Sequence, residues 1–209
     1  MLVTAAGQRI GRATAVAMAR DGAQVWAIDS RPALLVPLEE VPGVRAIALD
    51  ALDRGATTRL IESMPALDAL INCALSPHGG CASVLTDEHW NAALNANVRA
   101  PFWVIQAALP RMLSAGQGAI VNLLASIAVA NDRPNRFADM TTRAAMVGVT
   151  LGVATDCVAD GVRCNAICGE VADADASIAA FTALAIYLAS DESAAVTGQT
   201  CSPDHRVAS

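Results

Sequence analysis

A turn of small residues, followed at a set distance by an acidic residue, is the first feature of the sequence that could do chemistry. Residues 4–13 (TAAGQRIGRA) follow a short apolar run and open a helical pattern. Such a turn lets the phosphates of a dinucleotide approach backbone N–H groups at a helix N-terminus, where the helix dipole favours negative charge. Asp29 ends the next apolar run, near the roughly 20-residue spacing at which an acid accepts hydrogen bonds from adenosine ribose hydroxyls. Because a carboxylate repels a 2′-phosphate, we expect NAD rather than NADP. The alternative is an ordinary strand–helix turn, with Asp29 capping the next helix.

A second pair of polar residues lies further along the chain. Asp139 and Arg143 are one helical turn apart, and Ser126 precedes them at the end of an apolar run. An aspartate is ionised at neutral pH, so Asp139 could accept a proton but not donate one. Arg143 could hold ribose hydroxyls, but an arginine does not take part in proton relay. The simpler alternative is an ion pair on one helix face, worth about 0.3 to 0.5 kcal/mol.

The composition limits the class of protein that could carry these residues. The chain has 209 residues, of which 54% are hydrophobic, but charges interrupt every apolar stretch before the roughly 18 to 20 residues of a membrane span. We therefore expect one domain, residues 1–209, with no membrane partner. The start shows no basic leader, and the six cysteines show no metal-binding spacing, so we expect a cytoplasmic protein with no metal site. The net charge of −6 without a run of like charges argues against a nucleic-acid partner.

Apolar runs of strand length alternate with helical patterns along the whole chain. This alternation predicts an α/β fold: a Rossmann-type, doubly wound parallel sheet in a three-layer α/β/α sandwich. The tail contains Pro203 and little strand pattern, so we expect the last strand to be short. The expected strands are residues 2–4, 24–29, 44–49, 67–73, 119–124 and 163–168. The expected helices are residues 10–21, 55–64, 87–113, 139–159 and 176–190.

Several motifs in the same order resemble those of the short-chain dehydrogenase/reductase family. Residues 4–11 resemble its TGxxxGxG turn, with Ala5 and Arg9 replacing two glycines; pteridine reductases of that family also carry an arginine at the second position, next to the cofactor phosphates. Residues 72–75 (NCAL) are similar to its NNAG motif, and residues 161–165 (GVRCN) and 187–193 (YLASDES) are most similar to the cytosolic hydroxybutyrate dehydrogenase type. The resemblance implies cofactor contacts at Thr4, Gly7, Arg9, Ile10, Gly11, Asp29, Asp50, Asn72, Ala74 and Arg143.

The resemblance also implies where the chemistry would take place. The family moves a hydride to or from nicotinamide while a tyrosine hydroxyl passes the proton, helped by a lysine four residues later, a serine and an asparagine. Ser126 and Asn97 match the last two, but Asp139 and Arg143 stand at the tyrosine and lysine positions. The chain contains no lysine, and its one tyrosine, Tyr187, lies in a different helical pattern. Loss of a positioned acid costs about 10² to 10⁴ in rate, so we expect the conventional reaction to be impaired or lost.

Further departures fall at the same end of the expected cofactor site. Leu75 replaces the glycine of NNAG, and Glu170 follows Cys168 and Gly169 where the family has Pro-Gly. The last helical pattern then begins within about ten residues, where the family inserts a much longer substrate lid. His78, on the loop after the fourth expected strand, is either a solvated loop residue or an acid/base group.

Three hypotheses follow. The first is an NAD-binding oxidoreductase by descent, acting on a small hydroxy or keto compound, with its hydride transfer impaired or lost. The second is an atypical or non-redox enzyme that uses Asp139 as a base, assisted by Ser126 or His78. The third is a catalytically silent nucleotide-binding subunit. Helices 87–113 and 139–159 resemble the family's oligomer-forming helices, so we expect a homodimer or homotetramer.

Overall fold

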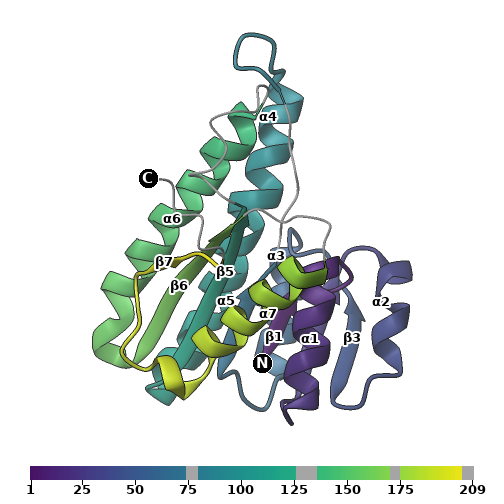
Figure 1. Ribbon diagram of the computed structural model, residues 1–209, viewed down its shortest axis with the longest axis vertical. Helices are drawn as coiled ribbons and strands as arrows, with labels where there is room; N and C mark the ends of the chain where they lie inside the picture. The colour runs from purple at the N-terminus through teal and green to yellow at the C-terminus, as the bar shows by residue number, and fades with distance from the viewer. Residues whose placement is uncertain (74–79, 126–135, 170–174, 204–209) are drawn as a thin grey trace.

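A seven-stranded parallel sheet forms the middle layer of the molecule (Figure 1). The computed structural model describes residues 1–73, 80–125, 136–169 and 175–203. The strand order is β3-β2-β1-β4-β5-β6-β7, so the direction of winding reverses between β1 and β4. Ligands of such sheets bind at the carboxyl ends of the strands around this reversal. The strands are β1 (Leu2–Thr4), β2 (Val25–Asp29), β3 (Val44–Ala48), β4 (Ala69–Asn72), β5 (Gly118–Ala125), β6 (Val162–Gly169) and β7 (Thr200–Cys201).

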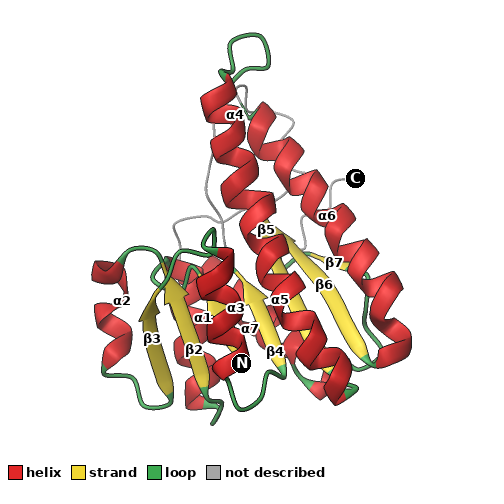
Figure 2. Ribbon diagram, turned by 180° about the vertical axis from the view of Figure 1, so that it is seen from behind, coloured by secondary structure: helices red, strands yellow, loops and turns green. Residues whose placement is uncertain are grey.

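Helices cover both faces of this sheet, as the expected three-layer architecture requires (Figure 2). One face packs against α1 (Arg9–Arg20), α2 (Pro32–Glu39) and α7 (Asp175–Ala189). The other packs against α3 (Arg54–Ser63), α5 (Ala100–Ala115) and α6 (Phe137–Cys157). The remaining helical elements are α4 (Asp87–Leu94), the π-helical turn η1 (Asn95–Arg99) and the 3₁₀ turns η3 (Val158–Asp160) and η4 (Asp191–Ser193).

One sequence-based expectation about a helix was wrong, and one helix was not predicted. The helix expected over residues 87–113 is divided into α4, η1 and α5, because the turn at Asn95–Arg99 is π-helical. The helix α2 was not predicted, since Pro37 interrupts its pattern and its sequence is apolar on nearly every side. It forms because Leu35 and Leu38 are buried in the core beneath it. The last strand, β7, is two residues long, as the tail composition predicted.

A chain of buried polar side chains crosses the centre of the sheet. The Thr4 hydroxyl donates to Asn72 Oδ1 (3.4 Å), and Asn72 Nδ2 donates to Asn122 Oδ1 (2.9 Å). Asn122 Nδ2 in turn donates to Thr150 Oγ1 of α6 (3.0 Å). These bonds satisfy polar groups that would be costly to bury alone, and they connect the first strand to α6. No described helix is both long enough and apolar enough to cross a membrane.

Candidate functional site

The turn between β1 and α1 has a shape that depends on two small residues. Ala5 has a φ of 47°, a left-handed conformation that glycine adopts more easily than other residues. Its carbonyl accepts a hydrogen bond from the Gln8 N–H (3.0 Å). A side chain on Gly11 would place its Cβ 2.5 Å from the same carbonyl oxygen, so only glycine fits there. The turn therefore brings the first residues of α1, with their unpaired N–H groups, to the carboxyl end of β1.

A cleft of about 320 Å³ opens beside this turn. Its walls come from the ends of β1 and β2, from residues 49–52 after β3, and from η1 and α5; they include Thr4, Gln8, Asp29, Asp50, Ala96 and Val104. Thr4, Asp29 and Asp50 were among the predicted cofactor contacts, and the structure places them around one cleft. It lies at the reversal of strand order, where the fold class predicts a ligand.

Asp29 holds the base of the cleft together. Its Oδ2 accepts the Gly7 N–H (3.2 Å), and its Oδ1 accepts the backbone N–H of Arg31 (3.0 Å) and the Arg31 Nε (3.3 Å). Asp29 is buried, whereas the Arg31 side chain is 56% exposed. Asp29 does not cap α2, whose first turn has no side-chain cap. The sequence had not singled out Arg31.

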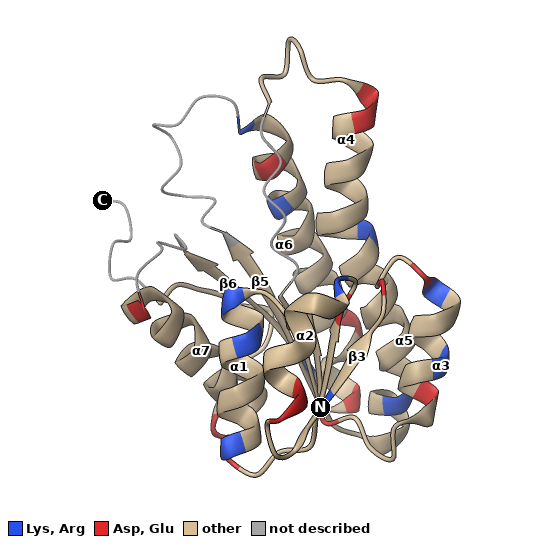
Figure 3. Cartoon of the chain, turned by 90° about the vertical axis from the view of Figure 1, so that its right-hand side faces the viewer, with Lys and Arg blue, Asp and Glu red and all other residues tan. Residues whose placement is uncertain are grey.

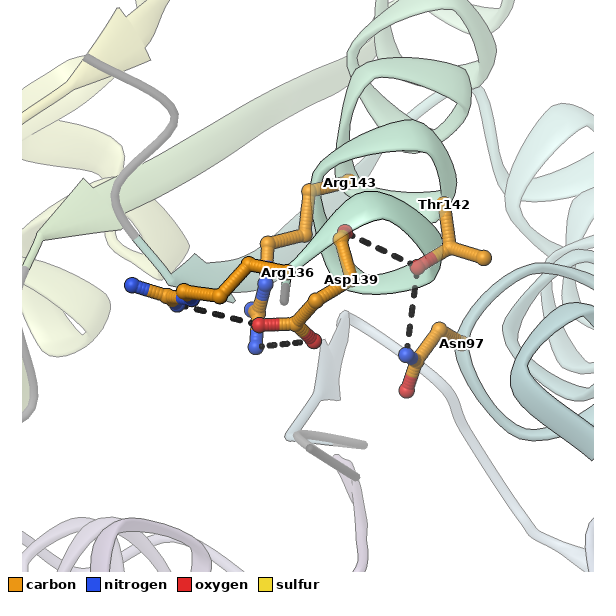
Figure 4. A network of polar contacts seen from close by, with 5 residues as sticks. All are labelled: Asn97, Arg136, Asp139, Thr142 and Arg143. Atoms are coloured by element: carbon orange, nitrogen blue, oxygen red, sulfur yellow. Dashed lines mark hydrogen bonds and ion pairs between the residues drawn. The ribbon is translucent and has the colours of Figure 1, made fainter. Parts of the chain in front are cut away.

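The second group of predicted residues forms a cluster on the first turns of α6 (Figure 4). Arg143 Nη2 donates to Asp139 Oδ1 (3.0 Å), so the predicted pair does form on one helix face. Arg136 Nη2 donates to the other oxygen, Oδ2, also at 3.0 Å. In Figure 3 the start of α6 carries a basic, an acidic and a basic segment in turn. Both oxygens of Asp139 are therefore held by cations.

Burial sets this cluster apart from a surface ion pair. The side chains of Asp139 and Arg143 are only 5% and 7% exposed, and that of Arg136 is 23% exposed. Removal of one partner from a buried pair leaves an uncompensated buried charge. Removal of one partner from a surface pair leaves a charge that water still solvates. Within the described chain, Arg143 Nε has no hydrogen-bond partner. The sequence signal for Arg136 was its i,i+3 spacing to Asp139, which had not been used.

Asn97 approaches this cluster from the π-helical turn η1. Its Nδ2 donates to the Thr142 hydroxyl (3.2 Å), which donates to the Asp139 carbonyl (3.0 Å). The irregular turn thus joins α4 and α5 to the start of α6 (Figure 4). π-helical turns occur often at functional sites. Thr142 was not among the predicted residues.

Five of the other predicted residues lie in the part of the chain that the structure describes, and five do not. Ile10, Gly7 and Gly11 are buried at the turn, Arg9 is exposed at the first position of α1, and Asn72 is buried at the end of β4. Ser126, Ala74, Leu75, His78 and Glu170 lie outside the described residues.

The cysteines offer little reactive chemistry near the cluster. Burial raises the pKa of the Cys168 thiol to about 11, although the Arg143 cation lowers it in part. Cys73, Cys157 and Cys164 are buried, whereas Cys81 is exposed. Within the described residues, no group of three or more His, Cys, Asp or Glu side chains could hold a metal ion.

Comparison with known proteins identifies the family to which this chain belongs. Residues 1–184 match the family model for short chain dehydrogenases. The chain is a short-chain dehydrogenase family member. It is 33% identical to "Dehydrogenase/reductase SDR family member 6" of Rattus norvegicus, over 95% of this chain and 92% of that protein. It is 37% identical to the 2-keto-3-deoxy-L-fuconate dehydrogenase of Xanthomonas campestris, over 95% of this chain and 76% of that protein.

Solved structures of this family have the same fold. A short-chain dehydrogenase/reductase from Burkholderia xenovorans superposes with a TM-score of 0.88 at 26% identity, covering 96% of this chain and 93% of that one. A short-chain alcohol dehydrogenase from Sinorhizobium meliloti superposes with a TM-score of 0.87 at 26% identity, covering 97% and 93%. The expected fold class and family are both confirmed.

Proposed function

We propose that this chain binds NAD through its adenosine half and that the family's conventional hydride transfer is impaired or lost in it. The observation that carries the proposal is the contrast between two ends of one site. The cleft at Asp29 and Asp50 keeps the groups that an adenosine ribose needs. The cluster on α6 holds a carboxylate between two guanidinium groups where the family has a tyrosine.

The residues of the adenosine end fit the cofactor. The β1–α1 turn has no room for a side chain at Gly11, as expected where backbone must come close to a pyrophosphate. Asp29 would accept from the ribose hydroxyls, and N–H groups at the start of α1 would hold the phosphates. When bound, the nicotinamide supplies a hydride donor or acceptor. The substrate class would be a small hydroxy or keto compound, as in the keto sugar acid dehydrogenase named above.

The proton-transfer end has lost its donor. A carboxylate can only accept a proton, and both oxygens of Asp139 already accept from arginines. These contacts commit the carboxylate of Asp139 to its two arginine partners. They argue against a non-redox enzyme built on Asp139. Arg143 would still be placed to donate to a ribose hydroxyl through Nε, its buried group without a described partner.

Isothermal titration with NAD⁺ tests the cofactor half of this proposal. We expect saturable binding that Asp29→Asn weakens by about tenfold, because a charge-assisted hydrogen bond to the ribose is lost. Asp21→Asn, an exposed aspartate at the far end of α1, is the matched control and should leave the affinity unchanged. An absence of binding at millimolar NAD⁺ would refute the proposal.

Restoration of the family's pair tests the catalytic half. The double substitution Asp139→Tyr with Arg143→Lys should raise NAD-dependent oxidation of small hydroxy acids by at least about tenfold over the starting protein. Each single substitution should raise it less, because the tyrosine needs the nearby cation to lower its pKa. High turnover in the unaltered protein would contradict an impaired site.

Exposed apolar residues favour a second role, in which the chain acts as a self-associating nucleotide-binding subunit. Phe102 and Leu113 are exposed on α5, and Leu151 and Val158 are exposed on α6 and at its end. Within each pair the spacing places both residues on one helix face. Light scattering after gel filtration should show a homodimer or homotetramer that Leu151→Glu dissociates. Val84→Glu, at a more exposed valine outside these helices, should not; a monomeric starting protein would exclude this role.

A further inference from the structure

The buried polar side chains that cross the sheet begin at the adenosine cleft and end on α6. They are Thr4, Asn72, Asn122 and Thr150, here called the polar network. We infer that the polar network couples these two places, so that a dinucleotide bound at the cleft makes α6 more rigid. The inference rests on the proposed dinucleotide binding. It gives a nucleotide-binding subunit a means of passing the state of its cleft to a helix that does not line that cleft.

Thr4 connects the polar network to the cleft. It is the last residue of β1, it lines the cleft, and it directly precedes Ala5, which begins the turn in a left-handed conformation. The Thr4 hydroxyl accepts the Cys73 N–H (3.2 Å) and donates to Asn72 Oδ1 (3.4 Å). A ligand that fixes the backbone of the turn therefore also fixes the position of this hydroxyl.

The hydrogen bonds of the polar network all run in one direction, from β1 toward α6. Asn72 Nδ2 donates to Asn122 Oδ1 (2.9 Å), and Asn122 Nδ2 donates to Thr150 Oγ1 (3.0 Å). The Thr150 hydroxyl then donates to the Met146 carbonyl (2.8 Å). Hydrogen bonds in such a series polarise and strengthen one another in a low-dielectric interior. The orientation of each group thus depends on that of its neighbour.

Burial makes the polar network respond as a unit. All four of its residues are buried, so bulk water does not replace a bond that breaks. A buried donor or acceptor that loses its partner costs about 1 to 3 kcal/mol. A small shift of Thr4 is therefore passed along the series at lower cost than it is absorbed by one broken bond.

The polar network meets α6 near the middle of that helix. A threonine hydroxyl that donates to the carbonyl four residues earlier competes with the backbone hydrogen bond of the helix. Here the donor from Asn122 holds the Thr150 hydroxyl in place. Helices open locally with free energies that depend on such contacts. A better fixed Asn122 should therefore make local opening of residues 146–154 rarer.

A purely structural role for the polar network makes a different prediction. If it only stabilises the fold, loss of one bond should speed local opening of α6 to the same extent with and without a ligand. If it couples the two places, loss of one bond should remove the effect of the ligand on α6. The change that a ligand causes, rather than the stability of α6 itself, separates these roles.

The experiment is hydrogen–deuterium exchange of the full chain with and without saturating NAD⁺, with isothermal titration to measure affinity. In the unaltered chain, NAD⁺ should slow amide exchange in residues 146–154 by about tenfold, a usual size for coupling between sites. Thr150→Val keeps the shape of the side chain but removes its oxygen, and should reduce this effect to less than about twofold. Its NAD⁺ affinity should stay within about threefold, because α6 is closed nearly all of the time in either protein.

Two further variants complete the comparison. Thr155→Val removes the same kind of bond, from a hydroxyl to the Leu151 carbonyl (2.8 Å), at an exposed position of the same helix. It should leave the effect of NAD⁺ on α6 unchanged. Thr150→Ser keeps the hydroxyl and should also retain the effect. Thr150→Ala makes the same test if the valine variant does not fold. Exchange in α1, at the turn itself, should slow with NAD⁺ in every variant.

The outcomes separate this inference from the proposed function. If NAD⁺ binds but does not slow exchange in α6 of the unaltered chain, the inference is wrong while the proposed function stands. The same holds if NAD⁺ slows that exchange equally in Thr150→Val. If NAD⁺ does not bind, the proposed function fails and the inference fails with it. An effect on α6 that is lost in Thr150→Val and kept in Thr150→Ser and Thr155→Val supports both.

Discussion

Asp139 shows how a change of one residue alters the chemistry available to its neighbours. A tyrosine at this position would be a proton donor beside a cation, whereas an aspartate becomes the partner of that cation. The structure adds a second cation, Arg136, on the other carboxylate oxygen. Three side chains are thereby committed to one another, two of them almost fully buried. Asp139 and Arg143, which the sequence motifs place at the family's tyrosine and lysine positions, hold the start of α6 together with Arg136.

The buried pair gives a prediction about stability. Asp139→Ala should lower the free energy of unfolding by about 3 kcal/mol, because Arg143 would remain charged and buried without its partner. The double variant Asp139→Ala with Arg143→Met should recover part of that loss. Urea unfolding measures both, with the exposed Asp156→Ala in the same helix as a control. A double variant as unstable as the sum of its single variants would mean that the pair is not coupled.

Ala5 is a second residue at which the sequence motif differs from the glycine that the family resemblance predicts. It adopts a φ of 47°, which costs a residue with a Cβ about 1 to 2 kcal/mol. Ala5→Gly should therefore raise the free energy of unfolding, by up to about 1 kcal/mol once the greater freedom of glycine in the unfolded chain is counted. The adjacent Ala6, which is buried and has no positive φ, is the matched control. Ala6→Gly should destabilise; thermal unfolding that shows both substitutions destabilising would contradict the strain.

At the scale of elements, periodicity and spacing predicted most of the sheet and the glycine-rich turn. The strands were placed to within two residues, because buried parallel strands have short apolar runs between turn signals. The helix α2 was missed because its burial depends on the core beneath Leu35 and Leu38 rather than on a polar–apolar pattern. The break at η1 was missed because a π-helical turn has no clear sequence pattern, and Asn97 reaches Thr142 only after two distant helices pack together.

The chain of polar side chains through the sheet predicts how firmly α6 is held. Thr150→Val keeps the shape of the side chain but removes the oxygen that accepts from Asn122 Nδ2. We expect a loss of about 1 to 3 kcal/mol in the free energy of unfolding, since a buried donor loses its best partner. Thr155→Val, at an exposed threonine in the same helix whose hydroxyl donates to Leu151, should cost less than about 0.5 kcal/mol. Chemical denaturation that gives equal losses for the two variants would show that the buried bond contributes little.

At the scale of the whole molecule, two fully buried thiols belong to its apolar cores rather than to its site. Cys73 and Cys164 lie in the cores on opposite faces of the sheet. Burial raises the pKa of Cys164 from 9.0 to about 12 and raises that of Cys73 further still. The sequence could not predict how far burial would suppress the ionisation of these thiols. The extent of that suppression depends on how deeply the helices packed on the sheet bury each thiol.

These buried thiols predict that the fold weakens in alkaline solution. A thiol whose pKa is about 12 in the fold and 9.0 in the unfolded chain stabilises the fold fully below pH 9 and loses that contribution as the pH rises toward 12. Each pH unit above 9 should cost about 1.4 kcal/mol for each such thiol. Cys164→Ala should lower stability near neutral pH by leaving a small cavity, yet it should flatten the alkaline decline by that amount. Cys81→Ala, at an exposed thiol whose pKa is lowered by hydrogen bonding with Ser83, should not flatten the decline. Urea unfolding from about pH 8 to about pH 11 measures these slopes, and equal slopes for Cys164→Ala and the unaltered chain would show that this thiol is not protected by the core.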